Sequence, residues 1–137
     1  MENSTMPILD KTFVENLIPQ KFPFVMVDKL LSFCVNKITA GLTVPENNLF
    51  VKNGVFQEAG LIEHMSQSVA LYTGYQYFLK QEPAHVGYIG AIKTIEIFQL
   101  PKLSEDIETT VTILNEFMCV TLVDIAVKLN DTEIARG

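Results

Sequence analysis

Two side chains that can exchange protons, Glu63 and His64, stand side by side in residues 58–80, which read EAGLIEHMSQSVALYTGYQYFLK. A carboxylate and an imidazole supply the acid and the base that many proton-transfer reactions require. From Met65 to Leu79 no residue is charged, so the pair stands at the head of the most apolar helix that the sequence predicts. Neighbouring helix positions are about 100° apart, and we therefore expect the two side chains to lie on different faces.

Few other side chains are candidates for chemistry. The second of the two histidines is His85, in the connection 81–88. Cys34 and Cys119 lack the spacing of a redox or metal motif, which predicts reduced thiols in the core. No set of ligand residues has metal-binding spacing, and no glycine-rich phosphate or dinucleotide fingerprint occurs. We therefore expect neither a metal nor a cofactor.

Length and charge narrow the class of protein. The 137 residues predict one domain, residues 1–137, and 48% of them are hydrophobic, which is enough for a core. A net charge of −6 without a cluster of Lys or Arg argues against nucleic acid as a partner. The N-terminus has no signal-peptide pattern, and the uncharged part of the helix is too short and too polar to span a membrane. The sequence predicts a cytoplasmic protein without membrane insertion.

Apolar periodicity predicts an α+β fold with an antiparallel sheet. The residues Val123, Ile125, Val127 and Leu129 alternate with outward-facing positions, as in a half-buried strand. The helix of residues 59–80 is apolar nearly all round, so we expect a curved sheet to wrap it. The predicted elements are a helix at 10–18 after an Asp10 cap, a strand hairpin at 24–35 and 37–44, a loop at 45–57, the helix, and strands at 89–100, 106–117, 120–130 and from 133.

Three segments resemble a known family, the last of them YIGAIKTIEIFQLPKLSEDI, which fits a strand and turn of that family. LIPQKFPFVMVDKLLSF, residues 17–33, resembles the opening of the hotdog-fold 3-hydroxyacyl-(acyl-carrier-protein) dehydratases, L-P-H-R-Y-P-F-L-L-V-D-R. LIEHMSQSVALYTG, residues 61–74, resembles the start of their central helix. The closer likeness is to a divergent branch found with aryl-polyene-type pathways. The resemblance implies a hotdog fold, at least a dimer, and a lyase that acts on acyl chains bound to acyl carrier protein in fatty-acid or polyene biosynthesis.

The resemblance assigns the catalytic carboxylate but not its base. Glu63 matches the acid of the family's central helix, whereas Leu49 and Gln20 stand where the family has histidines. His64, reaching the partner subunit's site, and His85, ahead of a strand that lines the groove in hotdog folds, are therefore the candidate bases.

Three residues are expected to contact the substrate. Backbone amides near Gly60 at the helix N-terminus can stabilise the charge that gathers on a thioester carbonyl. Gln67, one turn after Glu63, either orients the carboxylate or bonds to the facing backbone, and Leu49 occupies the place of the missing histidine. Docking of an acidic carrier protein would use a basic patch drawn from Lys21, Lys29, Lys52, Lys93 and Lys102.

Each assignment has an alternative. Glu63 could serve only the helix dipole, His64 could be a polar residue at a subunit boundary, and His85 could be a solvated loop residue. A chain without the histidine could be the non-catalytic subunit of a heterodimer with another hotdog protein, and the same scaffold could support an acyl thioesterase.

Overall fold

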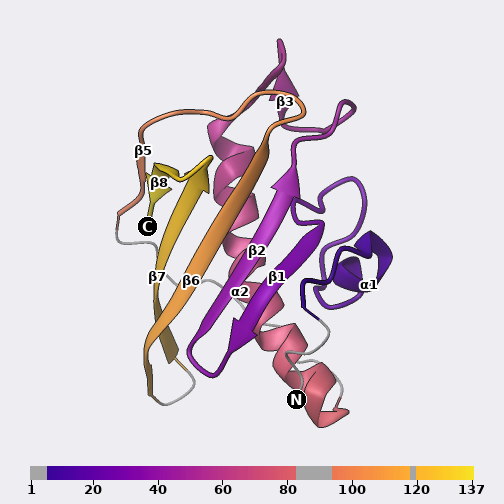
Figure 1. Cartoon of the computed structure of the whole chain (residues 1–137), viewed down its shortest axis with the longest axis vertical. Coiled ribbons are helices and arrows are strands. Elements are labelled where there is room, and N and C mark those ends of the chain that lie inside the picture. Colours follow the sequence, from indigo (N-terminus) through magenta and orange to yellow (C-terminus); the bar gives the residue numbers. More distant parts are fainter. Residues whose placement is uncertain (1–5, 83–93, 118–119) are drawn as a thin grey trace.

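Six strands form one antiparallel sheet, and a long helix lies across one of its faces (Figure 1). The structure is a computed structural model that describes residues 6–82, 94–117 and 120–137. Its elements are α1 (Lys11–Glu15), β1 (Lys29–Cys34), β2 (Lys37–Thr43), β3 (Val51–Lys52), β4 (Val55–Phe56), α2 (Glu58–Lys80), β5 (Glu96–Ile97), β6 (Asp106–Phe117), β7 (Val120–Leu129) and β8 (Thr132–Arg136). The strand order in the sheet is β1-β2-β6-β7-β8-β5, while β3 and β4 pair separately.

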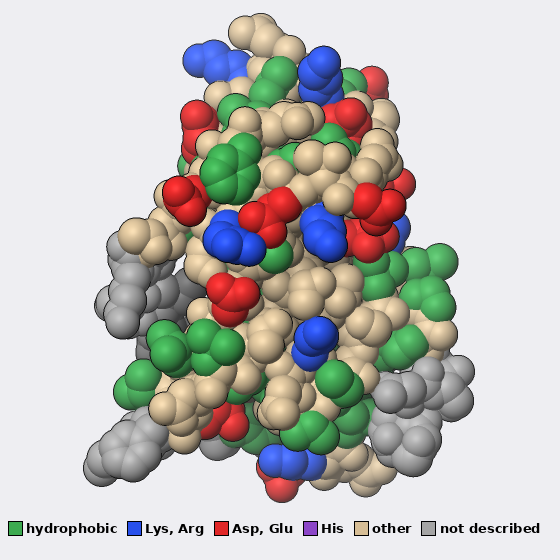
Figure 2. All heavy atoms as spheres, turned by 60° about the vertical axis from the view of Figure 1, so that its left-hand side comes forward, with side chains coloured by type: hydrophobic (Ala, Val, Ile, Leu, Met, Phe, Trp, Pro, Cys, Tyr) green, Lys and Arg blue, Asp and Glu red, His purple; other side chains and the backbone are tan. Residues whose placement is uncertain are grey.

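Alternation along the central strands decides which side chains face α2. On β7 the side chains of Ile125, Val127 and Leu129 are buried, as the sequence predicts, while Val123, the fourth residue of the predicted row, is half-buried. Between them, outward-facing side chains include Lys128, which pairs across the strands with Glu108 of β6. Opposite charges directly across a sheet attract each other. This pair lies on the outer face of the sheet, away from α2. Figure 2 shows acidic and basic side chains interspersed over the upper half of one face of the molecule.

The helix α2 buries a broad face against the sheet and against the segments that pack beside it before β1 and around β3 and β4. Its buried residues recur every three or four positions, which is the period of a helix face; they are Gly60, Leu61, His64, Met65, Gln67, Ser68, Leu71, Tyr72, Gly74 and Tyr75. Other positions, among them Ile62, Glu63 and Thr73, are half-buried. Within the described ranges, no helix has the length and hydrophobicity to cross a membrane.

The first helix and the first strand are shorter than predicted. Asp10 caps α1 as expected, accepting hydrogen bonds from the amides of Thr12 and Phe13 at 3.1 and 3.3 Å. The predicted strand at 24–35 begins only at Lys29, because backbone groups of Phe24 and Met26 bond to side chains of α2 instead. This segment, residues 24–28, packs against α2 and is called the strap below.

Two further expectations need correction. The predicted loop at 45–57 contains the small β3–β4 hairpin, in which Val51 pairs with Phe56. Cys34, expected in the core, is exposed at the end of β1, because its neighbour Phe33 packs on Tyr72 and Tyr75 of α2 and successive side chains of a strand point to opposite faces. Cys119 lies outside the described residues.

Candidate active site at the head of the long helix

Glu63 occupies the second turn of α2, on the half-buried side of the helix. Its Oε2 atom accepts a hydrogen bond from Nε2 of Gln67 at 2.8 Å. Residues four apart lie one above the other on a helix, which explains the contact. The bond fixes one oxygen of the carboxylate in place.

The Gln67 side chain is fully buried and has several hydrogen-bond partners at once. Its Nε2 donates to the carbonyl oxygen of Phe24 at 2.7 Å, and its Oε1 accepts from the amide of Met26 at 2.6 Å. A backbone amide can only donate and a carbonyl can only accept, so these partners fix which way round the amide lies. Gln67 therefore bonds to the facing backbone and to Glu63 together, the two alternatives that the sequence left open.

His64 lies on the sheet-facing side of α2 and is 0% exposed. Its Nδ1 donates to the carbonyl oxygen of Met26 at 2.7 Å, and its Nε2 lies 2.6 Å from the hydroxyl of Thr109 on β6. Burial lowers the pKa of the imidazole from 6.5 to about 4, although the Met26 bond and the charge of Asp28 oppose this shift. The ring is therefore neutral near pH 7 with its proton on Nδ1, and Thr109 donates to Nε2.

The adjacent residues Glu63 and His64 have different surroundings. Glu63 is half-buried on one side of α2, while His64 points into the core on another, as helical geometry predicts. Both ring nitrogens of His64 are occupied by partners in its own chain. The geometry therefore favours a structural role for His64 over the predicted role of base.

Gly60 lies in the first turn of α2, beneath two aromatic residues. A Cβ atom at this position would lie 2.5 Å from Cβ of Phe50 and 2.6 Å from Cε1 of Phe56. No side chain fits in that space, so packing alone explains the glycine. The first-turn amides of a helix nonetheless have no acceptor within the helix, which keeps the predicted oxyanion role open.

The remaining predicted site residues are scattered. Leu49 is 54% exposed in the loop before β3. Gln20, at the family's other histidine position, has a buried Oε1 atom without a hydrogen-bond partner in the described part of the chain. His85 lies outside the described residues.

Sequence reasoning missed two members of this site. Thr109 interrupts the inward-facing row of Ile107 and Val111 on β6, and a polar residue in an apolar row was a signal that could have identified it. Met26 contributes through its backbone amide and carbonyl. No residue type encodes such a role, so only the fold could reveal it.

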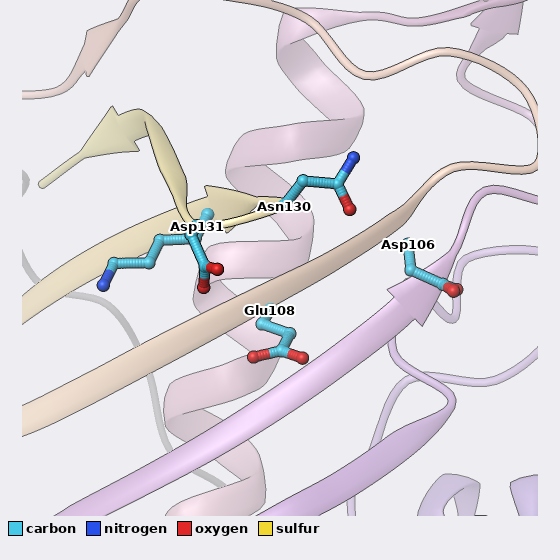
Figure 3. A pocket seen from close by; sticks show the side chains of 5 residues that line it. Asp106, Glu108, Asn130 and Asp131 are labelled. Atoms are coloured by element: carbon cyan, nitrogen blue, oxygen red, sulfur yellow. The ribbon is translucent and has the colours of Figure 1, made fainter.

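A separate depression lies on the outer face of the sheet (Figure 3). It is lined by Asp106, Glu108, Lys128, Asn130 and Asp131. Because side chains alternate along a strand, Glu108 points away from the face where Thr109 contacts His64. Within the described residues, no group of His, Cys, Asp and Glu side chains is arranged to hold a metal ion.

Comparison with known proteins places the chain in context. Residues 12–133 match the model of the ApeP-like family, described as ApeP dehydratase. No curated protein matches the sequence. The dehydratase heterocomplex ApeI:P from Xenorhabdus doucetiae aligns with a TM-score of 0.83 and 15% identity, over 90% of this chain and 86% of that one.

Two further solved structures align less closely. The PaaI protein of a phenylacetic acid degradation operon in E. coli has a TM-score of 0.62 and 11% identity, over 78% of this chain and 76% of that one. A hypothetical thioesterase with coenzyme A from Streptococcus pneumoniae TIGR4 has a TM-score of 0.58 and 11% identity, over 78% and 77%. Together with the antiparallel sheet and the long helix, these alignments confirm the predicted α+β hotdog fold.

Proposed function

Because the chain belongs to the ApeP-like family of dehydratases, we propose that it removes water from a 3-hydroxyacyl thioester with Glu63 as an acid–base group. A base takes the proton from C2, an acid protonates the hydroxyl at C3, and water leaves as the C2–C3 double bond forms. The observation that carries the proposal is a half-buried carboxylate held at 2.8 Å by the fully buried Gln67.

Glu63 suits the role of the group that handles the C3 hydroxyl. The Gln67 bond engages Oε2, so Oε1 is the oxygen that we expect to face the substrate. A carboxylate held in one orientation needs less reorganisation before proton transfer. Gln67 is itself saturated by Phe24, Met26 and Glu63, which favours a supporting role over the predicted contact with substrate.

We infer that the base comes from outside the described part of this chain. His64 has both ring nitrogens occupied and a pKa lowered to about 4 by burial. The related solved structure from Xenorhabdus doucetiae is the dehydratase heterocomplex ApeI:P. We propose a second hotdog subunit, which brings an imidazole to the half-buried side of α2 beside Glu63, with His85 as the alternative base.

We propose that the acyl chain arrives on acyl carrier protein, in fatty-acid or polyene biosynthesis in the cytoplasm. Acyl carrier proteins are acidic, so their docking requires basic side chains on this chain. Lys52 and Lys102 both pair with Val55, from opposite sides of β4. Paired residues of adjacent strands project to the same face, and both lysines are exposed close to the start of α2. They form the basic pair that the substrate's carrier would contact.

The test is a mass-spectrometric assay of 3-hydroxyacyl-carrier protein with the purified chain, alone and together with a histidine-bearing hotdog subunit. Glu63→Gln is the informative variant, because its amide oxygen can still accept from Gln67 while the acid is lost. We expect loss of water from the wild type with its partner, and a drop of at least about a hundredfold in the variant.

Other outcomes would identify the alternatives. Full turnover by the Glu63→Gln complex would make this chain a non-catalytic subunit. Release of free acid without loss of water would indicate a thioesterase, a chemistry that the aligned hotdog structure from Streptococcus pneumoniae brings into consideration. Turnover by the chain alone would direct the search for the base to His85.

A further inference from the structure

Four residues beneath Glu63 are completely enclosed. Met26, His64, Gln67 and Thr109 are each 0% exposed. Buried polar groups are costly unless they are hydrogen-bonded, and here each is bonded to another member of the group. The members come from the strap before β1, from α2 and from β6, so three parts of the fold meet at this point.

The hydrogen bonds run in one order from the sheet to Glu63. Thr109 donates to His64, and His64 donates to the carbonyl oxygen of Met26 at 2.7 Å. The amide of Met26 donates to Gln67 at 2.6 Å, and Gln67 donates to Glu63 at 2.8 Å. Met26 is the junction, because one side of its backbone is held by His64 and the other by Gln67.

We propose that this buried network orients the Glu63 carboxylate, with Thr109 as a positioning residue at its far end. The proposal rests on the catalytic role proposed for Glu63. Gln67 Nε2 carries two hydrogens; one is donated to the carbonyl oxygen of Phe24 and the other to the Glu63 carboxylate. With both hydrogens and Oε1 engaged, Gln67 is held in one orientation by the strap, and the half-buried carboxylate that accepts from it is linked to the core.

The perturbation of choice is Thr109→Val, which removes the hydroxyl and keeps the shape. The matched control is Thr110→Val on the same strand, because Thr110 is half-buried on the other face and its hydroxyl lies 3.3 Å from that of Thr39. Thr109→Ser restores the hydroxyl and should restore the wild-type behaviour. Each variant is made in the full chain.

The first readout does not depend on activity. The side-chain amide protons of Gln67 are followed by ¹H–¹⁵N NMR in all variants and in Glu63→Gln. We expect these resonances to move in Thr109→Val and in Glu63→Gln, and to stay in place in Thr110→Val and Thr109→Ser. Unchanged Gln67 resonances in Glu63→Gln, a variant on the outer side of the helix, would overturn the proposal even if Thr109→Val failed to fold.

The second readout is turnover of the complex with its partner subunit. We expect Thr109→Val to lower kcat about tenfold with KM changed less than about twofold, since misorientation of an acid affects the chemical step. An equal loss in Thr110→Val, or a loss that matches the unfolded fraction, would overturn the positioning role. Absence of turnover in the wild type would refute the proposed function, while the NMR comparison would still decide whether the network exists.

Discussion

Acidification should destabilise this protein through the buried imidazole of His64. In the folded chain, burial lowers the pKa of His64 from 6.5 to about 4. Between these two values the unfolded chain binds a proton that the folded chain does not. Stability therefore rises with pH in this window and falls as the pH is lowered from 6.5 towards 4.

The size of the effect follows from the same two values. Each pH unit of the gap between 6.5 and about 4 is worth about 1.4 kcal/mol. The His64 imidazole can therefore change the free energy of unfolding by about 3 kcal/mol in total. Most of this change falls between about pH 7 and about pH 4.5. Over that range we expect the free energy of unfolding to fall by about 2 kcal/mol through His64 alone. The full loss requires a pH below about 4, where the folded imidazole also binds its proton.

Urea unfolding at a series of pH values measures this loss. The chain has no Trp, so unfolding is followed by far-UV circular dichroism at fixed protein concentration. Wild type is compared with His64→Gln, whose side chain does not titrate, and with His85→Gln as the control that keeps the buried imidazole. The carboxylates are common to all three proteins, so their contributions cancel in the differences between the curves.

We expect the stability of wild type and of His85→Gln to fall by about 2 kcal/mol more than that of His64→Gln over this range. His64→Gln itself starts lower, because it changes a buried hydrogen-bonded group, but its pH dependence should be flatter. Equal pH slopes in wild type and His64→Gln would refute the reasoning. Equal slopes would mean that His64 binds a proton as readily in the folded chain as in the unfolded chain.

Three further outcomes are expected from other parts of the fold. Gly74→Ala should lower the free energy of unfolding by several kcal/mol, because the new Cβ would lie 1.9 Å from a backbone carbonyl oxygen, whereas Gly41→Ala, with contacts no shorter than 3.4 Å, should change little; thermal unfolding compares the two. Asp10→Ala should lower the free energy of unfolding by about 1 kcal/mol through loss of the α1 cap. Asp10→Asn should keep most of the wild-type stability, because Asn also caps helices; urea unfolding measures both variants. Tyr72→Phe removes a hydroxyl that donates to the carbonyl of Val35 and accepts from Nε2 of Gln76 at 3.3 Å, and it should cost about 1 kcal/mol. Gln76→Ala removes only the second of these bonds and should cost less in the same urea unfolding measurement.

Much of the architecture could be predicted from the sequence because it depends on local patterns. The alternation of Val123, Ile125, Val127 and Leu129 predicted the inward face of β7; Val123 is half-buried and the other three are buried. The uncharged run after His64 predicted a long helix, and α2 extends over Glu58–Lys80. The strap at residues 24–28 was predicted as strand because it is apolar. Within it, the carbonyl oxygen of Phe24 and both backbone groups of Met26 bond to side chains of α2, and no local pattern distinguishes these partners from a neighbouring strand.

The sequence by itself determined the type of helix, the family resemblance and the candidate acid, because these depend on residue types and on spacings within one segment. Helical periodicity also sufficed to place Glu63 and His64 on different faces of the helix. Only the tertiary structure decided what surrounds each of them. His64 reaches Thr109 across 45 positions of the sequence and Met26 across 38, and such distant contacts exist only once the sheet has packed against the helix. Burial then keeps His64 neutral in the core and leaves Glu63 half-buried on another side of the helix.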